Sequence, residues 1–430
     1  MNPSSAVSVL SHPLPGGMRD FLPGEARAQE ALVGRVLGTF ELHGFQQVGL
    51  PVFEYTDVLE RGLGAIPPSS MLRFVEPDSG EVVALRPDMT PQVARLVATR
   101  LADGPFPARL AYRGSVLRRR HERARHEQQV LQAGIELIGR GTGGTLDADL
   151  EVLSATTSAV RSAGLDEFVL DLGHGGLSRS LIERVEPELK AALLEALSLK
   201  DQAELVRRAE RGGLARELVR ELALLVELHG DIGVFERGRH GLSVRAQGAI
   251  AELEELHRRV EQRGLASSVV IDLGETSQVA YYTGCTFQIL AEGPGQAVAS
   301  GGRYDELLSA FHVELPAAGA AIHIDHLRWA LGNENVGEPC RVLVVPGGPE
   351  SGDAGGDAGA ERALATLRAA GIPSVVAVSD QALDYARAWR YSHLVRLTEA
   401  DSVRLMRVDE GAEHELGVLT LAEAVERLRR

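Results

Sequence analysis

The fold is decided by two stretches, LAYRGSVLR at residues 110–118 and VLQAGIELI at residues 130–138. Both are short apolar runs rich in the residue types that favour strands. The connector between them is very polar and rich in arginine. This pattern predicts an antiparallel pair of strands joined by a long loop, and loops of this kind often carry function.

The composition indicates a soluble, globular protein. The chain has 430 residues, and 45 Lys and Arg against 60 Asp and Glu give a formal charge of −15. That length predicts two or three domains, at about 150 residues per domain. No run approaches the roughly 18 apolar residues of a membrane span, and the N-terminus lacks the pattern of a secretory signal. The acidic total works against general binding to nucleic acid.

Cysteine is rare, with only Cys285 and Cys340 in the chain. Two distant thiols support neither a disulfide framework nor a thiolate metal cage. We therefore expect a cytoplasmic protein that holds no metal and no cofactor.

The rest of the chain adds helices and further strands. Residues 1–331 are expected to form the larger domain, interrupted at about 177–263 by a helical insertion rich in Leu, Ala, Glu and Arg. After a polar linker, residues 340–430 alternate between strand and helix patterns and predict a small α/β domain. The other expected elements are a helix at 25–42, strands at 45–53, 81–85, 268–273, 280–291 and 297–300, a helix after Pro91 and one at 305–311.

Three groups of residues could carry chemistry. The first is LRPDMTP at 85–91, where Asp88 and Thr90 precede a helix and could equally be capping residues. The second is the loop at 118–126, whose five arginines could grip phosphate or could form a solvated or partner-binding surface. The third combines YYTG at 281–284 with GGRYD at 301–305, whose tyrosines could line a polar pocket or lie in the core.

The order of these motifs resembles that of the class II histidyl-tRNA synthetase family. The motifs follow one another in the order that is typical of that family. They are GGMRDFLP at 16–23, RPD at 86–88, the strand–loop–strand ending in QAGIE at 132–136, and the two tyrosine motifs. The resemblance covers about residues 14–331, and the C-terminal domain is similar in pattern to the family's anticodon-binding domain. It implies an α+β fold with an antiparallel sheet core flanked by helices, a dimer, and pockets for histidine and ATP.

The resemblance also shows where this chain departs from a working synthetase. Arg118 matches the arginine that holds the ATP α-phosphate, but Arg120 replaces the glutamate that reads the adenine. Ser277-Gln278-Val279-Ala280 replaces Arg-Gly-Leu-Asp, and His326 replaces the arginine that clamps the γ-phosphate. Each lost contact to phosphate is worth about 1.5–3 kcal/mol, so two of them predict a rate loss on the order of 10² to 10⁴. We expect the catalytic residues to be absent and Arg118 to be at most a remnant of a phosphate site.

The part of the pocket that would hold free histidine is better preserved. By resemblance, Asp88 and Thr90 face the α-ammonium group, Gln132 and Glu136 lie deeper, and three tyrosines line the walls. Buried carboxylates with hydroxyl neighbours suit a cationic amine and an imidazole donor. The predicted histidine-binding residues are Asp88, Thr90, Gln132, Glu136, Tyr281, Tyr282 and Tyr304.

A synthetase-like chain with a kept amino-acid pocket and a damaged ATP site resembles the regulatory subunits of ATP phosphoribosyltransferase. That likeness implies a short-form catalytic subunit as partner, L-histidine as ligand, and a homodimer within a hetero-oligomer. It also implies activation and histidine feedback in the first step of L-histidine biosynthesis, with tRNA binding not expected. The alternative is an active or repurposed histidyl-tRNA synthetase, which the C-terminal domain leaves open.

Overall fold

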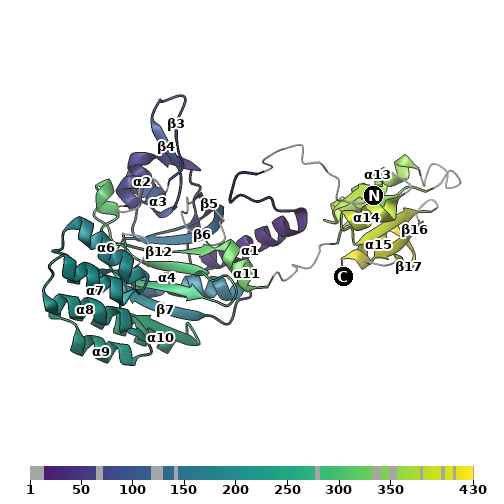
Figure 1. Ribbon diagram of the computed structural model, residues 1–430. Coiled ribbons are helices and arrows are strands. Elements are labelled where there is room, and N and C mark those ends of the chain that lie inside the picture. The colour runs from purple at the N-terminus through teal and green to yellow at the C-terminus, as the bar shows by residue number, and fades with distance from the viewer. Residues whose placement is uncertain are drawn as a thin grey trace. The chain divides into compact units, whose positions relative to one another are not determined.

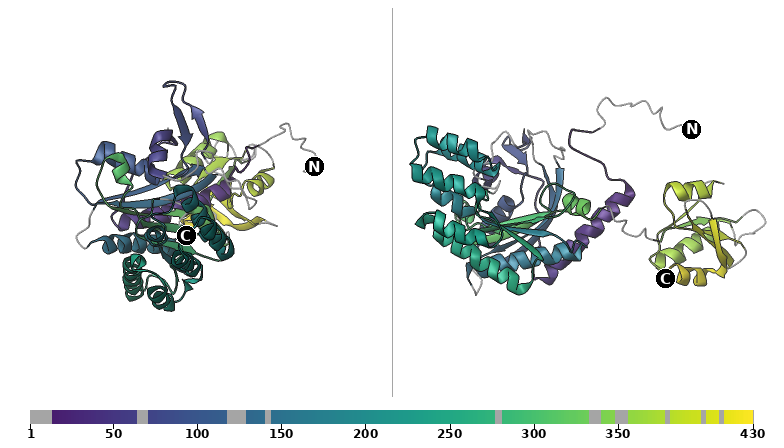
Figure 2. Two further views of the ribbon diagram at one scale, coloured as in Figure 1. Left: turned by 60° about the vertical axis from the view of Figure 1, so that its left-hand side comes forward. Right: turned by 60° about the horizontal axis from the view of Figure 1, so that its bottom comes forward.

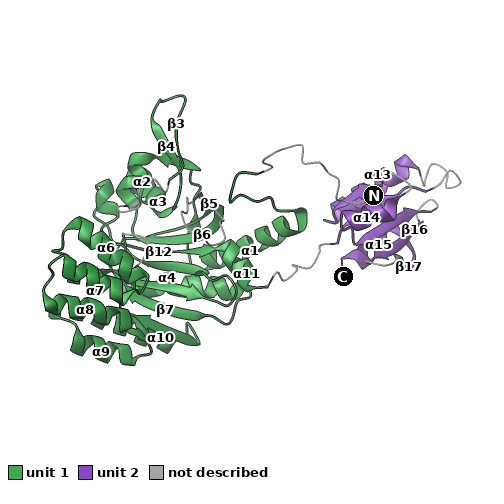
Figure 3. Cartoon of the chain, in the orientation of Figure 1, with its two compact units in different colours: residues 1–334 green, residues 335–430 purple. Residues whose placement is uncertain are grey.

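The computed structural model describes residues 14–63, 71–117, 129–139, 144–276, 281–332, 340–347, 356–377, 381–398, 402–409 and 413–429 (Figure 1). The chain divides into two compact units, residues 1–334 and residues 335–430 (Figure 3). Among the described residues, no helix has both the length and the apolar character needed to cross a membrane.

Unit 1 is built on a nine-stranded sheet. In spatial order its strands are β1 (Gln46–Gln47), β5 (Ala108–Leu117), β6 (Gln129–Ile138), β12 (Ala317–His323), β11 (Ala299–Arg303), β10 (Cys285–Leu290), β7 (Val169–His174), β9 (Ser268–Asp272) and β8 (His229–Gly230). Neighbouring strands from β5 to β7 pair antiparallel. The predicted α+β class with an antiparallel core is confirmed.

Two pairings near the edges of this sheet are parallel, which the sequence analysis did not predict, while the edge strand β8 pairs antiparallel with β9. Strand β1 runs parallel to β5, and β7 runs parallel to β9. Parallel neighbours require long crossover connections, and here the insertion between β7 and β9 supplies one of them.

Three long helices cover one face of the sheet, and their apolar side chains form the largest core with it. They are α1 (Pro23–Leu42), α4 (Thr145–Ser162) and α10 (Val244–Arg263). Helix α1 begins at a proline, whose missing N–H costs nothing in the first turn. The Glu25 carboxylate accepts a hydrogen bond from the Leu22 backbone amide and completes the cap. The buried side chains of α1 are Leu32, Val33, Val36 and Phe40, at helical spacing.

The segment between β7 and β9 is mainly helical. It contains α5 (Gly175–Leu181), α6 (Pro187–Ser198), α7 (Gln202–Arg211), α8 (Arg216–Glu227), α9 (Gly233–Gly241) and α10, with strand β8 between α8 and α9. Helices α6 to α9 stack at one end of unit 1 (Figures 1 and 2).

A second, three-stranded sheet has the order β2 (Phe53–Tyr55), β4 (Val82–Leu85) and β3 (Arg73–Val75). It packs on α2 (Thr56–Leu63) and lies beside α3 (Thr90–Leu96), which continues into a π-helical turn at Val97–Leu101. The hairpin formed by β3 and β4 projects from unit 1 (Figure 1).

Unit 2 is a small α/β unit with the strand order β14 (Ser374–Val376), β13 (Val342–Val345), β15 (His393–Leu397), β16 (Ser402–Val408) and β17 (Glu413–Thr420). The first three strands are parallel, and the last two form the antiparallel hairpin that the sequence predicts. Its helices are α13 (Asp357–Ala369), α14 (Ala382–Ala388) and α15 (Leu421–Leu428).

Three local predictions are wrong. A single strand at 45–53 is expected, but β1 and β2 belong to different sheets with Pro51 between them. Proline cannot donate to a strand ladder, and the Pro51 carbonyl instead accepts hydrogen bonds from Arg86 and Gln92. The helix expected at 305–311 is only a 3₁₀ turn at Leu308–Phe311. The strand expected at 280–291 begins only at Cys285, and the rings of Tyr281 and Tyr282, before it, pack against each other at 5.0 Å.

Candidate functional site

The site begins where β4 ends. Asp88 Oδ1 accepts a hydrogen bond from the Thr90 backbone amide at 3.1 Å, so the carboxylate supports the first residue of α3. Its other oxygen, Oδ2, accepts from the Tyr281 hydroxyl at 3.0 Å. The N-cap of α3 is Met89, without a side-chain cap, so the capping interpretation is wrong, and the Asp88 carboxylate instead joins the Thr90 amide to the Tyr281 hydroxyl.

Glu136 lies at the centre of the site and is only 1% exposed. Its carboxyl group accepts hydrogen bonds from the Thr90 hydroxyl at 2.7 Å and from the Tyr112 hydroxyl at 3.2 Å. The Tyr304 hydroxyl donates to its second oxygen. Burial raises the pKa of Glu136 well above its usual value, and the negative charge of Asp88 raises it further. In the ligand-free protein this carboxyl group therefore tends to hold its proton.

Three tyrosines form one wall of the site. The ring centroids of Tyr281 and Tyr282 are 5.0 Å apart, and those of Tyr281 and Tyr304 are 5.3 Å apart. All three belong to the apolar cluster beneath α3, so the core interpretation and the pocket interpretation both describe them. Their hydroxyl groups nevertheless point into a polar site, as the contacts of Tyr281 and Tyr304 show.

Glycines make room for these side chains on one face of the sheet. Glu136 pairs with Gly319, Gly319 with Gly302, and the row continues through Thr286 to Gly173. A Cβ at Gly319 would overlap the Glu136 carboxylate, and a Cβ at Gly302 would lie 2.9 Å from Cδ1 of Tyr282. Glycine is therefore required at positions 302 and 319, because a larger side chain there would displace Tyr282 or Glu136.

Six of the seven predicted histidine-binding residues are joined by these contacts. The seventh, Gln132, lies on the same face of β6 as Glu136, four residues away. It is buried, and its Oε1 accepts no hydrogen bond from the described residues. Its position on that face agrees with the predicted site, although no direct contact joins it to Glu136.

Of the positions compared with the phosphate-binding and adenine-binding residues of a synthetase, the structure describes only His326. Arg118, Arg120 and residues 277–280 lie outside the described residues. His326 is described, and its Nδ1 lies 2.8 Å from the Ala297 carbonyl oxygen and 3.3 Å from Nδ1 of His323.

Sequence analysis missed two residues of the site. Tyr112 pairs with Gly134 across β5 and β6, which puts its hydroxyl beside Glu136. Pairing the two predicted strands in register would have revealed it. The second is Arg86, whose buried guanidinium group donates to the carbonyl oxygens of Leu50, Pro51 and Ser115. Arg86 thereby holds in place the segment after β4 that carries Asp88. The sequence around Arg86 does not indicate these acceptors, because they lie about 30 or more residues away in the chain.

A buried group elsewhere in unit 1 has the composition of a metal site. His174, Glu252 and Cys285 place one potential ligand atom each within 4.8 Å of one another. However, His174 Nδ1 accepts from the Gly176 amide, so Nε2 carries the proton and faces Glu252 at 3.1 Å. Arg303 also donates to Glu252, and burial raises the pKa of the Cys285 thiol. These contacts favour a structural network over a metal site.

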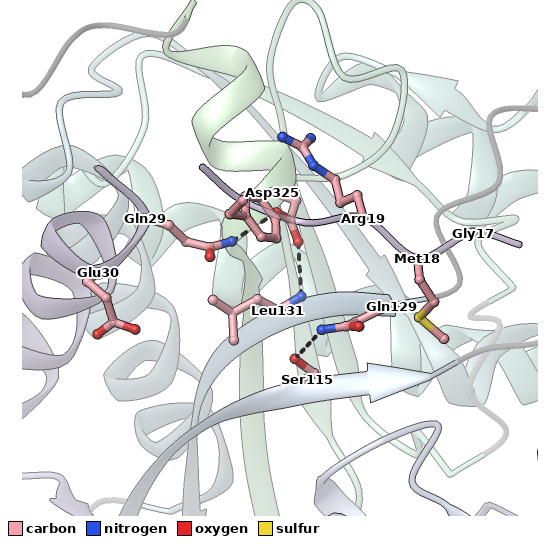
Figure 4. Close-up of a pocket in the computed structure, with 10 residues that line it drawn as sticks. Gly17, Met18, Arg19, Gln29, Glu30, Ser115, Gln129, Leu131 and Asp325 are labelled. Atoms are coloured by element: carbon pink, nitrogen blue, oxygen red, sulfur yellow. Dashed lines mark hydrogen bonds between the residues drawn. The ribbon is translucent and has the colours of Figure 1, made fainter. Parts of the chain in front are cut away.

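An open pocket of about 400 Å³ lies against the opposite face of β5 and β6 (Figure 4). Its polar side chains already have partners: Asp325 accepts from Gln29 and from the Leu131 amide, and Gln129 donates to Ser115. Arg19 donates to Glu25, and Glu30 accepts from Arg113. Among the described residues, Thr90, Tyr112 and Tyr304 converge on Glu136, which makes this cluster the candidate site.

The fold and the site define a class II synthetase-like protein. A family model described as histidyl-tRNA synthetase matches residues 17–327. The crystal structure of histidyl-tRNA synthetase from Nostoc sp. PCC 7120 is similar over 98% of this chain and 99% of that chain, with a TM-score of 0.76 and 21% identity. At that identity the likeness shows the fold alone.

Relatives of higher sequence identity show which family within this class the chain belongs to. A protein from Syntrophotalea carbinolica named ATP phosphoribosyltransferase regulatory subunit is 34% identical over 96% of this chain and 97% of its own length. One of the same name from Anaeromyxobacter sp. is 42% identical over 76% of this chain and 95% of its own. A crystal structure from Bacillus halodurans, described as an ATP phosphoribosyltransferase regulatory subunit/histidyl-tRNA synthetase, has a TM-score of 0.74 and 28% identity, over 91% of this chain and 99% of that chain. The chain belongs to the family of ATP phosphoribosyltransferase regulatory subunits.

Proposed function

We propose that this chain is the non-catalytic regulatory subunit of an ATP phosphoribosyltransferase. In this role it activates a short catalytic subunit and conveys histidine feedback in the first step of L-histidine biosynthesis. The observation that carries the proposal is the buried polar cluster around Glu136, which is intact although His326 stands where a synthetase needs an arginine.

The cluster has the chemistry of a free histidine site. Asp88 offers a carboxylate to the α-ammonium group, with the Thr90 hydroxyl beside it. Glu136 offers an acceptor for an imidazole N–H, and Tyr304 and Tyr112 supply hydroxyl groups that can donate or accept. Burial strengthens each of these contacts and excludes competing water. Gln132, Tyr281 and Tyr282 complete the predicted ligand shell.

The region around His326, where a synthetase would bind the phosphates of ATP, is poorly suited to ATP. His326 directs Nδ1 to a carbonyl oxygen, and a single remaining imidazole nitrogen cannot replace the fork of an arginine. Loss of synthetase activity is part of the proposal, and the alternative of an active histidyl-tRNA synthetase is not favoured.

The partners follow from the same reasoning. We place the chain in the cytoplasm as a homodimer within a hetero-oligomer, without cofactor or metal and without tRNA binding. An exposed apolar face on the three-stranded sheet supports protein contacts: Phe53, Tyr55 and Phe74 are each at least 40% exposed, and the rings of Phe53 and Phe74 lie 5.4 Å apart.

Co-purification tests the assembly. A tagged copy of this chain, expressed with the short catalytic subunit encoded in the same genome, should retain that subunit through affinity and size-exclusion steps. Failure of the two chains to associate, with or without histidine, would contradict the proposed function.

A further inference from the structure

Arg303 is a buried arginine on the opposite side of the sheet from the candidate pocket. It ends β11, directly before Tyr304, and is only 5% exposed. Because side chains alternate along a strand, Tyr304 points to the face that carries the pocket, while Arg303 points to the face that α4 and α10 cover. A buried guanidinium group is costly unless it is paired, so its contacts indicate what it does.

Carboxyl groups from both helices surround Arg303. Its Nη2 atom lies 2.5 Å from Glu252 Oε1 of α10, and Glu252 Oε2 lies 3.1 Å from His174 Nε2. Its Nε atom lies 3.6 Å from Asp149 Oδ2 of α4 and 3.8 Å from Asp305 Oδ2. The shortest of these contacts is to Glu252, which therefore does most to fix the guanidinium group.

The guanidinium group lies against the backbone of Gly284. A Cβ at Gly284 would lie 2.2 Å from both Nε and Nη2 of Arg303. The Gly284 amide donates to the Arg303 carbonyl oxygen at 3.2 Å, and its own carbonyl oxygen accepts from the Gly175 amide at 2.9 Å. The Thr283 amide donates to the same Arg303 carbonyl oxygen at 2.8 Å. Arg303 therefore contacts, with its side chain and its backbone, the segment that directly follows Tyr282.

The residues next to these contacts form the pocket wall. Tyr304 follows Arg303 in the chain, and its hydroxyl group donates to Glu136. Tyr282 lies two residues before Gly284, and its ring centroid is 6.3 Å from that of Tyr304. A shift of Gly284 or of the end of β11 would therefore move the side chains that surround Glu136.

We propose that Arg303 is a positioning residue for the histidine pocket. Held by Glu252 behind the sheet, its guanidinium group fixes Gly284 and the end of β11, and thereby the tyrosines on the opposite face. Histidine affinity then depends on how α10 lies against the sheet. The inference rests on the proposed histidine site.

The test measures histidine affinity by calorimetric titration of the full chain. The variant Arg303→Met/Glu252→Gln replaces the ion pair with neutral side chains of similar size, so neither charge is left buried without its partner. The remaining Asp149 then keeps its proton, because burial raises its pKa and Arg303, which opposes this shift, is absent. The variant should melt near the wild-type temperature, and its Kd for L-histidine should rise about 10-fold, within the usual range of coupling between sites.

Arg259→Met is the matched control. Arg259 also joins α10 to α4, but its ion-pair partners among the described residues, Glu255 and Asp147, both lie on these helices. The control should therefore bind histidine as wild type does. Wild-type affinity in Arg303→Met/Glu252→Gln, or an equal loss of affinity in Arg259→Met, would overturn the proposal.

Gly284→Ala reaches the same contact from the other side, without a change of charge. The added methyl group should displace the guanidinium group and weaken histidine binding to a similar extent. In the background of Arg303→Met/Glu252→Gln it should add little, because the flexible methionine can move aside. Losses that simply multiply would contradict the proposal. If one of the two variants does not fold, wild-type affinity in the other has the same meaning.

A further readout needs no ligand. The amides of Thr283 and Gly284 should exchange hydrogen faster in Arg303→Met/Glu252→Gln than in wild type, because the segment is less firmly held. If wild type binds no histidine, the proposed function fails, and this exchange rate alone decides whether Arg303 fixes the segment. Unchanged exchange would overturn the inference in either case.

Discussion

Removal of the Glu136 carboxyl group should weaken histidine binding. In Glu136→Ala the hydroxyl groups of Thr90, Tyr112 and Tyr304 lose their common acceptor. A hydrogen bond between the imidazole N–H and a carboxylate is worth about 1.5–3 kcal/mol, which corresponds to about 10- to 150-fold in affinity. Glu136→Gln keeps a neutral acceptor of the same shape, worth about 0.5–1.5 kcal/mol, so its loss should be smaller.

Glu136 should also release a proton when histidine binds. Burial favours the protonated form of Glu136 in the ligand-free protein, and the ionised carboxylate accepts a stronger hydrogen bond from an imidazole N–H than the neutral carboxyl group does, so histidine binding should favour loss of this proton. Wild-type affinity should therefore rise with pH below the pKa of Glu136. Glu136→Gln has no proton to release, and the difference between the two pH profiles cancels the titration of histidine itself.

Isothermal titration of the purified chain with L-histidine measures both effects, and repeating it in two buffers of different ionisation enthalpy counts the protons. Glu167→Ala is the matched control, since it removes an exposed carboxylate just before β7. A folded Glu136→Ala variant that binds histidine as wild type does would refute the assignment. The tyrosines would then be core residues only.

Three further predictions concern catalysis, nucleic acid and stability. The purified chain should show no histidine-dependent exchange of pyrophosphate into ATP, because Ser277 and His326 stand where the reaction needs arginines; robust exchange would contradict this. It should not bind histidine tRNA strongly at physiological salt, because the chain carries a charge of −15 and unit 2 contains no lysine; a sub-micromolar specific complex in a filter-binding assay would count against it. The wild-type free energy of unfolding should fall as the pH rises from about 4 to about 7, since burial raises the pKa of Asp149 from 3.8 to about 7 and the folded state binds its proton more tightly. Asp149→Asn should remove about 2.7 kcal/mol of the fall between about pH 5 and about pH 8, measured by urea unfolding at these two values. An unchanged slope would show that Asp149 does not titrate in this range.

The sequence predicts those parts of the fold that depend on local pattern. Strands β5 and β6 follow from two apolar runs around a polar loop, and the helical spacing of Leu32, Val36 and Phe40 predicts α1. The pattern around Pro51 fails because a proline ends a strand without showing which sheet the chain joins next.

The site is predictable where a motif carries it and not where distant backbone supplies the partner. Asp88, Thr90 and Glu136 come from motifs, and the structure brings them together. Arg86 lies within a quoted motif, yet its three acceptors are backbone carbonyls from two other segments.

The reconstituted complex gives the most direct test of the regulatory role. Formation of phosphoribosyl-ATP by the short catalytic subunit should rise when this chain is added and should fall again as L-histidine is titrated in. With Asp88→Ala or Glu136→Ala, activation should persist while the histidine concentration needed for inhibition rises by about 10- to 150-fold. No activation by the wild-type chain, or unaltered feedback in both variants, would contradict the account.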